Sequence, residues 1–423
     1  MKLFIHLTMA LMLCAALILS ACDDDGGSGG GSDGYTLITI SAISGVIPPA
    51  CGQTPATTIT ETPQFAGAIT WSPVDSSFEG ETAYTATITL SAKSGCTLTG
   101  VSANFFTVAG ATSCTNDADS GIVTAVFPAT VYSAGDMVNH TADSVSFNMV
   151  YVPGGFTFPT GVDDEGTATV DYAYWTGEAE VTYALWSTVY GWAATDAGSG
   201  TREDGGELYV FANAGVMGDG TGDTVQHPVT YINWRDAMVW CNALTEWYNA
   251  QTGAGYECAY TYSSAIIRDS TDTTACDNAE AGATAKGFRL LSSNEWELAA
   301  RYRDGTLWAY GDHASGDDTG ACYDDGSTLD GLAVSTVFGN YAVYTVNSNS
   351  STAAVKRKTF NALGLYNMSG NAQEWCFDKS GSRRVARGGS WEGDASGLRV
   401  GFVSTPIPGG VFYTTGFRIA RSQ

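Results

Sequence analysis

Histidine and basic residues are scarce in this chain of 423 residues. It contains 4 histidines, and 19 Lys and Arg residues stand against 44 Asp and Glu residues, which gives a formal net charge of -25. Beyond position 21 only His140, His227 and His313 remain, far apart in sequence, so a histidine-based metal or acid-base cluster has little material. The acidic excess argues against nucleic acid as a partner, because phosphate binding needs a basic face. A cationic ligand or calcium is easier to accommodate.

No pair of cysteines has the CxxC spacing of common zinc and redox sites. Eight of the ten cysteines follow Cys22, and such a number fits an exported, oxidised protein with disulfides. The pairing is not readable from the sequence. We expect one disulfide between two of Cys51, Cys96 and Cys114, and another between Cys258 and Cys276.

The amino terminus carries the long apolar run of the chain, from Leu3 to Leu19, and it ends in LSAC. This resembles a bacterial lipoprotein signal peptide, residues 1–21, whose removal leaves a lipidated Cys22. An uncleaved membrane helix is the alternative, but the run is short and DDDGGSGGGSDG follows at once. Residues 22–34 have the composition of a flexible tether. We therefore expect a membrane-associated protein of the bacterial cell envelope, lipid-anchored at the outer membrane or cell surface.

Residues 35–140 alternate apolar and polar positions in short segments such as TAYTATITLSA and GIVTAVFPATVY. Val, Ile, Thr and aromatic residues at period two, with Gly, Pro and Ser between the segments, predict antiparallel strands. An all-β sandwich follows. The segment resembles the immunoglobulin-like modules of bacterial surface proteins, which implies adhesion; a stalk that spaces the next domain from the membrane is the alternative.

Helical patterns appear after residue 145. EVTYALWSTVYGW reads as a helix, and in NWRDAMVWCNALTEWYN the side chain of Asn233 can cap a helix. In RLLSSNEWELAARY, Ser292 stands three residues before Glu295, which is the spacing of a capping box. The remainder is rich in Gly, Asn, Ser and aromatic residues, so much irregular backbone is expected.

A series of phrases in fixed order identifies the second domain: NMVYVPGGFTF, EVTYALW, HPVTYINWRDAMVWCN, GFRLLSSNEWELAAR, NALGLYNMSGNAQEW, ARGGSW and GFRIAR. Together they resemble the formylglycine-generating enzyme family, also called the sulfatase-modifying factor domain, over residues 145–423. The resemblance implies an α+β C-type-lectin-like fold, with two helices, small twisted sheets and long loops.

The active enzymes of that family oxidise a sulfatase cysteine and bind copper through two cysteines beside the GGS motif. On this chain those positions hold Gly393 and Leu398, which cannot ligate copper. The resemblance therefore implies a protein that is not an enzyme and has no copper. Cys376 fits neither position and reads as structural. Related iron-dependent sulfoxide synthases need a histidine cluster that this chain does not supply.

A calcium loop of the family is retained. NMSGNAQE places Asn367, Gly370, Ala372 and Glu374 at the positions that the resemblance assigns to an Asn side chain, two backbone carbonyls and a Glu. Oxygen donors on an irregular loop suit calcium. A structural calcium ion is the expectation; the alternative is that Asn367 and Glu374 only hydrogen-bond the turn closed.

The carboxyl-terminal frame of RGGSW and GFRIA also resembles the variable proteins of diversity-generating retroelements, where randomised template adenines change a loop on a fixed lectin-like scaffold. Randomised AAC codons keep their final C and never encode Glu, Lys, Gln, Met or Trp. None of these occurs from Gly393 to Thr415. The expected ligand contacts, which include a candidate apolar and aromatic patch, are Gly393, Asp394, Gly397, Val400, Phe402, Ser404, Thr405, Val411, Phe412 and Tyr413.

We therefore expect a surface-displayed binding protein whose ligand is a protein or another cell-surface molecule. A more specific form of this hypothesis is that a retroelement diversifies the binding loop. Two alternatives stay open. One is an oxidase of the formylglycine-generating type with other metal ligands, and the other is a fixed structural envelope lipoprotein.

Overall fold

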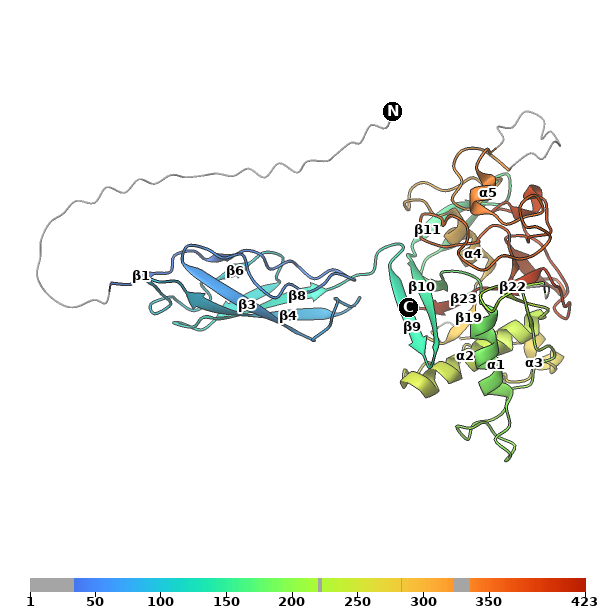
Figure 1. Ribbon diagram of the computed structural model, residues 1–423, viewed down its shortest axis with the longest axis horizontal. Helices are drawn as coiled ribbons and strands as arrows, with labels where there is room; N and C mark the ends of the chain where they lie inside the picture. The colour runs from blue at the N-terminus through green and yellow to red at the C-terminus, as the bar shows by residue number, and fades with distance from the viewer. Residues whose placement is uncertain (1–33, 220–222, 283, 323–334) are drawn as a thin grey trace, which may run out of the picture. The chain divides into compact units, whose positions relative to one another are not determined.

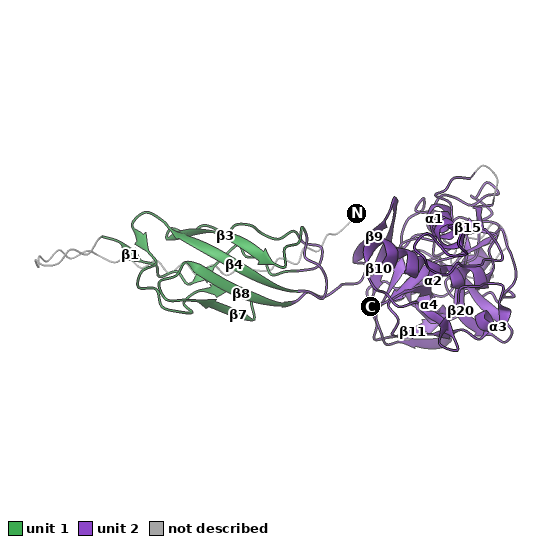
Figure 2. Cartoon of the chain, turned by 90° about the horizontal axis from the view of Figure 1, so that it is seen from below, with its two compact units in different colours: residues 1–49, 54–76, 83–128 green, residues 50–53, 77–82, 129–423 purple. Residues whose placement is uncertain are grey.

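The computed structural model describes residues 34–219, 223–282, 284–322 and 335–423. The expected signal peptide, the lipidation site Cys22 and nearly all of the tether lie outside these residues. The chain divides into two compact units (Figure 2): unit 1 takes residues up to 49 with 54–76 and 83–128, and unit 2 takes 50–53, 77–82 and 129–423. Within the described ranges, no helix combines the length and apolar character needed to cross a membrane.

Unit 1 is built from strands, as its period-two pattern predicts. Its main sheet has the order β3-β4-β8-β7, and two short parallel pairs, β1 with β5 and β2 with β6, accompany it. Every second side chain of β4 is buried, from Tyr84 to Leu90. The strands are β1 (Thr36–Leu37), β2 (Ala42–Ile43), β3 (Phe65–Ser72), β4 (Ala83–Ala92), β5 (Cys96–Thr97), β6 (Thr107–Val108), β7 (Ser113–Asn116) and β8 (Ile122–Ala129). The closer assignment to an immunoglobulin-like module stays a prediction.

The second domain begins earlier than position 145. Strand β9 (Met137–Ala142) pairs antiparallel with β10 (Val145–Val152), so that His140 lies opposite Phe147. The hairpin places β9 in the sheet of unit 2. The expected end of the first domain at residue 140 therefore falls inside a strand of the second.

The central sheet of unit 2 has the order β19-β23-β13-β10-β9, and all its paired neighbours are antiparallel. The last strand of the chain lies inside this sheet, between two strands that are far apart in sequence (Figure 1). The C-terminus is therefore held on both sides. The remaining strands of the sheet are β13 (Tyr174–Gly177), β19 (Phe288–Leu290) and β23 (Ile419–Ser422).

Three helices form where the sequence predicts them. Helix α1 (Tyr183–Ala194) begins after Thr182, and α2 (Trp234–Thr252) has the expected Asn233 cap. Helix α4 (Ser293–Arg301) has the capping box of Ser292 and Glu295. The indoles of Trp186 and Trp240 stack at 5.4 Å and join α1 to α2 in the larger hydrophobic core.

The rest of unit 2 is loops with short elements, as expected from its composition. A three-stranded sheet of order β21-β20-β22 frames the carboxyl-terminal region. The elements not yet given are β11 (Phe156–Thr160), β12 (Gly166–Val170), β14 (Val216–Met217), β15 (Val229–Thr230), β16 (Tyr260–Tyr262), β17 (Ala265–Ile266), α3 (Thr273–Asp277), β18 (Glu280–Ala281), α5 (Phe338–Tyr341), β20 (Gln373–Ser380), β21 (Arg383–Arg387), a 3-10 helix (Ala395–Leu398) and β22 (Thr415–Phe417).

The expected disulfides do not form. All eight cysteines in the described part of the chain are free thiols. The thiol of Cys258 lies against the carbonyl oxygen of Asn242, and that of Cys276 against the carbonyl oxygen of Asp269. The two sulfur atoms thus contact carbonyl oxygens on different segments. Cys258 and Cys276 are close in sequence but do not form a disulfide.

Candidate functional site

Residues 393–414, called the C-terminal loop from here on, connect two strands that lie on either side of a third. Strand β21 precedes the loop and β22 follows it, and both pair with β20. At Glu374 the register places Arg387 on one side and Gly416 on the other. The two ends of the loop are thus fixed on opposite edges of one strand.

Between these ends the loop is tied down through its own main chain. Its N–H and C=O groups bond to partners on β20, β21, α2 and three distant loops, and two arginine side chains also reach its carbonyl oxygens. The bonds from outside include Thr345 N–H to Gly393 O, Val400 N–H to His313 O, Gly401 N–H to Gly311 O, the reciprocal pair of Ser404 and Ala386, Arg384 N–H to Pro406 O, Trp234 N–H to Pro408 O, Tyr231 N–H to Phe412 O, Gln373 N–H to Thr414 O, Arg387 Nη1 to Phe402 O, and Arg383 Nη1 to Thr405 O.

These bonds, between 2.8 and 3.2 Å long, do not depend on which side chains the loop carries. Within the described residues, one hydrogen bond joins a loop side chain to a residue outside the loop, and it runs from the Tyr413 hydroxyl to Glu392. The path of the backbone is therefore separable from the surface that the loop presents.

The expected contact residues differ in exposure. Asp394, Val411 and Tyr413 are exposed, whereas the majority of the set, Gly393, Gly397, Phe402, Ser404, Thr405 and Phe412, is half-buried. Phe412 packs against the larger core, with its ring 6.3 Å from that of Trp375.

Val400 is a correction to the expected contact set. Its side chain is fully buried and packs in the core cluster that also contains Val152 and Leu298. No ligand on the surface can touch it. Val400 is an anchor of the loop, because the other buried members of its cluster all come from segments outside the loop.

Three further anchors hold the C-terminal loop from within. Ala395 and Leu398 are buried in the 3-10 helix, which Asp394 caps by accepting a hydrogen bond from the Gly397 N–H. A hydrogen bond from Ser396 lowers the pKa of the capping carboxyl. Gly401 has no room for a side chain, since a Cβ there would lie 2.2 Å from the Gly161 carbonyl oxygen.

The sequence reasoning missed residues that adjoin the loop surface. Val403 and Ile407 are exposed apolar side chains within the loop, and Glu392 is exposed just before it. Tyr231 comes from the phrase HPVTYINW, far away in sequence, and has a left-handed φ of 53°. Val403 and Ile407 stand in the same window as the expected contacts, so composition alone could have included them.

The two positions that the resemblance assigns to copper-binding cysteines hold Gly393 and Leu398. Leu398 is packed in a small core cluster with Ala395, and a Cβ at Gly393 would lie 3.1 Å from the Leu398 side chain. Cys376 is fully buried in the cluster of Val400, and burial raises the pKa of its thiol well above the ordinary value. A thiol held neutral among apolar side chains fits a structural role.

The expected calcium loop is closed by protein groups. Both carboxylate oxygens of Glu374 accept hydrogen bonds, from Arg418 and from the Trp296 indole, and the Asn367 amide oxygen accepts from the Lys356 N–H at 3.3 Å. The two side-chain donors proposed for calcium are thus occupied, and a guanidinium already neutralises the carboxylate. In this arrangement the donor set does not fit a calcium ion.

A buried carboxyl lies behind the same loop. Glu180 accepts hydrogen bonds from the Asn371 side chain and, at 3.4 Å, from the Ala372 N–H, while its second oxygen has no partner among the described residues. Burial, opposed by Arg418 and reinforced by Glu374, raises the pKa of Glu180 to about 8. This carboxyl is therefore largely protonated at neutral pH.

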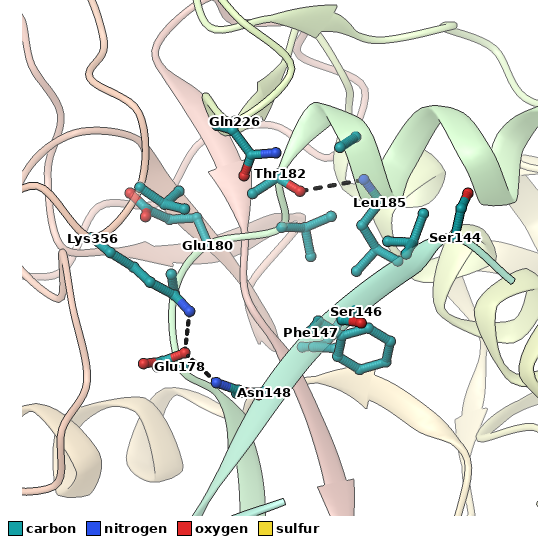
Figure 3. A pocket seen from close by; sticks show the side chains of 16 residues that line it. Ser144, Ser146, Phe147, Asn148, Glu178, Glu180, Thr182, Leu185, Gln226 and Lys356 are labelled. Carbon is teal, nitrogen blue, oxygen red and sulfur yellow. Dashed lines mark hydrogen bonds and ion pairs between the residues drawn. The ribbon is translucent and has the colours of Figure 1, made fainter. Parts of the chain in front are cut away.

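A polar cavity of about 280 Å³ lies on another part of unit 2 (Figure 3). At one end Lys356 and Asn148 both point to the carboxylate of Glu178, with the Asn148 amide 3.0 Å away. On the opposite side Thr182 caps α1 by accepting from the Leu185 N–H. None of the expected ligand contacts lines this cavity, so it is separate from the C-terminal loop.

Comparisons with known proteins agree with this architecture. The family model of the sulfatase-modifying factor enzyme 1-like domain matches residues 135–423. The solved structure of Treponema denticola variable protein 1 has a TM-score of 0.50 and 29% identity, covering 68% of this chain and 99% of that one. The structure of CarF has a TM-score of 0.48 and 24% identity, with coverage of 67% and 99%. Chaperone protein LppX of Paenibacillus barcinonensis is 25% identical over 66% of this chain and 91% of its own length.

The family match and the likeness to variable protein 1 confirm the expected formylglycine-generating-enzyme-like domain of C-type-lectin-like fold and its likeness to a variable protein. The matched range begins at residue 135, which agrees with the place of β9 in the sheet of unit 2.

Proposed function

The chain belongs to the family of sulfatase-modifying factor enzyme 1-like domains, and on that premise we propose that it uses the domain to bind a ligand with the C-terminal loop and performs no catalysis. One observation carries the proposal: the loop is tied to the domain through its main chain, so its exposed side chains are free for contact. A rigid scaffold with a replaceable surface is how binding loops are commonly presented.

The sharper form of the proposal is that a retroelement diversifies the loop. Its support is the absence of Glu, Lys, Gln, Met and Trp from residues 393–415, together with the likeness to a protein whose name is variable protein 1. The main-chain bonds supply a physical reason why such changes are tolerated. The anchors Ala395, Leu398, Val400 and Gly401 are the loop positions that we expect to stay fixed.

The absence of catalysis is part of the proposal. Gly393 and Leu398 offer no thiolate, and Cys376 is buried and protonated. We further propose that the protein is a lipid-anchored envelope protein, on the strength of the signal-like residues 1–21 and Cys22. Anchoring would set the C-terminal loop before ligands outside the membrane.

The decisive experiment is deep sequencing of codons 380–423 in a population grown from one cell, with a search for a near-identical template copy beside the gene. Substitutions at adenine-templated codons, with RGGSW and GFR unchanged, are the expected result. An invariant loop without a template would leave a fixed binding protein. Formation of aldehyde on a sulfatase peptide by the purified protein would overturn the non-catalytic assignment.

A further inference from the structure

Four side chains gather where the C-terminal loop rejoins the domain. They form what we call the aromatic-carboxylate cluster, which consists of Tyr231, Trp391, Glu392 and Tyr413. The ring of Tyr413 lies 5.9 Å from that of Trp391 and 6.2 Å from that of Tyr231, measured between centroids. Its hydroxyl donates a hydrogen bond of 2.6 Å to Glu392 Oε2.

The domain scaffold holds this cluster in place. Tyr231 is positioned by its N–H bond to the Phe412 carbonyl oxygen, and Trp391 by its N–H bond to the Asn371 carbonyl oxygen. The indole of Trp391 is buried, whereas Tyr413 keeps 37% of its surface exposed. One aromatic ring of a fixed group is thus offered to solvent beside a carboxylate.

The charge of Glu392 is not balanced within the described part of the chain. Its carboxylate is exposed and forms no ion pair with any described Lys or Arg side chain. Aromatic faces attract cations within about 6 Å of the ring centroid, and a neighbouring carboxylate adds direct attraction. The cluster therefore has the chemistry of a receptor for an organic cation.

The other flank of the loop is acidic as well. Beside Gly401, whose N–H bonds to Gly311, an open cavity of about 430 Å³ has Asp163, Asp312 and Asp318 in its wall. Asp318 is paired with Arg303 and Asp312 with the imidazole of His313, whereas Asp163 has no Lys, Arg or His partner among the described residues. Acidic groups on both flanks of the loop favour a partner with several positive charges.

We infer that the ligand of the C-terminal loop is a basic protein segment, one of whose arginine or lysine side chains lies on the Tyr413 ring and pairs with Glu392. This inference rests on the proposed function of the loop. The exposed Val411 then contacts the aliphatic stem of the same side chain or its neighbours, and the aspartates on the other flank meet further positive charges. An apolar or acidic partner would bury or repel Glu392 without compensation.

The test uses the full-length protein and three nine-residue glycine-serine peptides that carry three arginines, three lysines or three glutamates. Isothermal titration calorimetry at low salt measures binding of each. We expect the arginine and lysine peptides to bind, with weaker binding at higher salt, and the glutamate peptide not to bind. The difference between arginine and lysine shows which cation the cluster prefers.

Matched variants assign the binding to the cluster. Glu392→Gln and Tyr413→Leu should each weaken binding of the cationic peptides by about three- to tenfold. Tyr413→Phe keeps the aromatic ring and should lose less affinity for the cationic peptides than Tyr413→Leu. Glu203→Gln removes the same charge from an exposed site outside the loop and should bind like the unchanged protein. Circular dichroism spectra check that each variant is folded.

The outcomes separate this inference from the proposed function. Failure of the cationic peptides to bind, or equal binding by Glu392→Gln and the unchanged protein, overturns the cationic ligand. Suppose that a protein partner binds the unchanged protein and Glu392→Gln, but not the double variant Val411→Ser with Ile407→Ser. The loop is then still the binding surface, although its ligand is not cationic. If no loop substitution changes the binding of such a partner, and the loop codons do not vary in the population, both the cationic ligand and the proposed function of the loop are contradicted.

Discussion

The carboxylate of Glu374 and the guanidinium of Arg418 form a doubly hydrogen-bonded pair in the interior of unit 2, with contacts of 2.7 and 3.1 Å. Both side chains are essentially unexposed, and the Trp296 indole donates a further bond of 2.7 Å to the same carboxylate. The pair joins β20 to the junction of β22 and β23, and in the sheet Glu374 lies opposite Arg387 before the loop and Gly416 after it. The strands that flank the loop therefore pair at a residue of this buried ion pair.

Removing the arginine should be costly. Arg418→Met leaves a buried carboxylate without its counter-charge, and we expect the free energy of unfolding to fall by about 3–5 kcal/mol. Urea denaturation followed by circular dichroism measures it. The control is Arg303→Met, which breaks an exposed pair with Asp318 and should cost at most about 1 kcal/mol. Similar losses of unfolding free energy in the two variants would show that the buried pair of Arg418 contributes no more to stability than an exposed pair.

Calcium should not be required for this stability. Because Arg418 already neutralises Glu374, we expect the same melting temperature in excess EDTA and in millimolar calcium. Differential scanning calorimetry of the full-length protein compares the two conditions. A calcium-dependent rise of several degrees, lost in Asn367→Ala, would show that the loop rearranges to bind the ion.

His140 predicts a loss of stability in acid. Burial, together with nearby Arg421, lowers the pKa of His140 from 6.5 to about 4, so the folded state resists a proton that the unfolded state accepts. This contribution is complete above pH 6.5 and is lost as the pH falls toward 4, with a limit of roughly 3 kcal/mol. His140→Phe keeps an aromatic ring against Phe147. Its denaturation profile should show a smaller decline over that range than the unchanged protein.

Glu180 predicts the opposite trend. Its pKa rises from 4.5 to about 8 on folding, mainly through burial, so the folded state holds a proton that the unfolded state releases. Stability from this group is complete below pH 4.5 and is lost as the pH rises through about 8. Glu180→Gln mimics the protonated form, and its unfolding free energy should decline less over this window. An unaltered decline would place the charge change elsewhere.

Anchors and surface positions of the loop should respond differently to truncation. Val400→Ala and Leu398→Ala open space in packed clusters and should each cost about 2 kcal/mol or more. Val411→Ala removes an exposed side chain and should change stability by no more than about 0.5 kcal/mol. Thermal melts of the three variants give the comparison. Equal costs would mean that the surface side chains also hold the loop.

The parts of the fold that the sequence could predict are those set by neighbouring residues. Asn233 and Ser292 cap their helices because the groups they bond lie within the next turn. The order of the motifs located the second domain for the same reason, because each motif is a short run of neighbouring residues. The early start of unit 2 was missed because β9 differs little in composition from the strands before it.

The parts that could not be predicted depend on distant segments. Nothing near Val400 in the sequence shows that the fold places it in one buried cluster with Val152 and Leu298. Tyr231 becomes part of the loop surface only through its backbone bond to Phe412. The predicted disulfide between Cys258 and Cys276 was wrong for a similar reason, because the positions of the two thiols are set by contacts with other segments.

The main-chain ties of the C-terminal loop make it a natural engineering platform. A library that randomises the exposed positions Val403, Ile407, Val411 and Tyr413, while retaining the buried ones and the Asp394 cap, would keep every backbone bond that shapes the loop. Selection for new targets could then proceed without selecting again for folding. Members of such a library should share one melting temperature while differing in what they recognise.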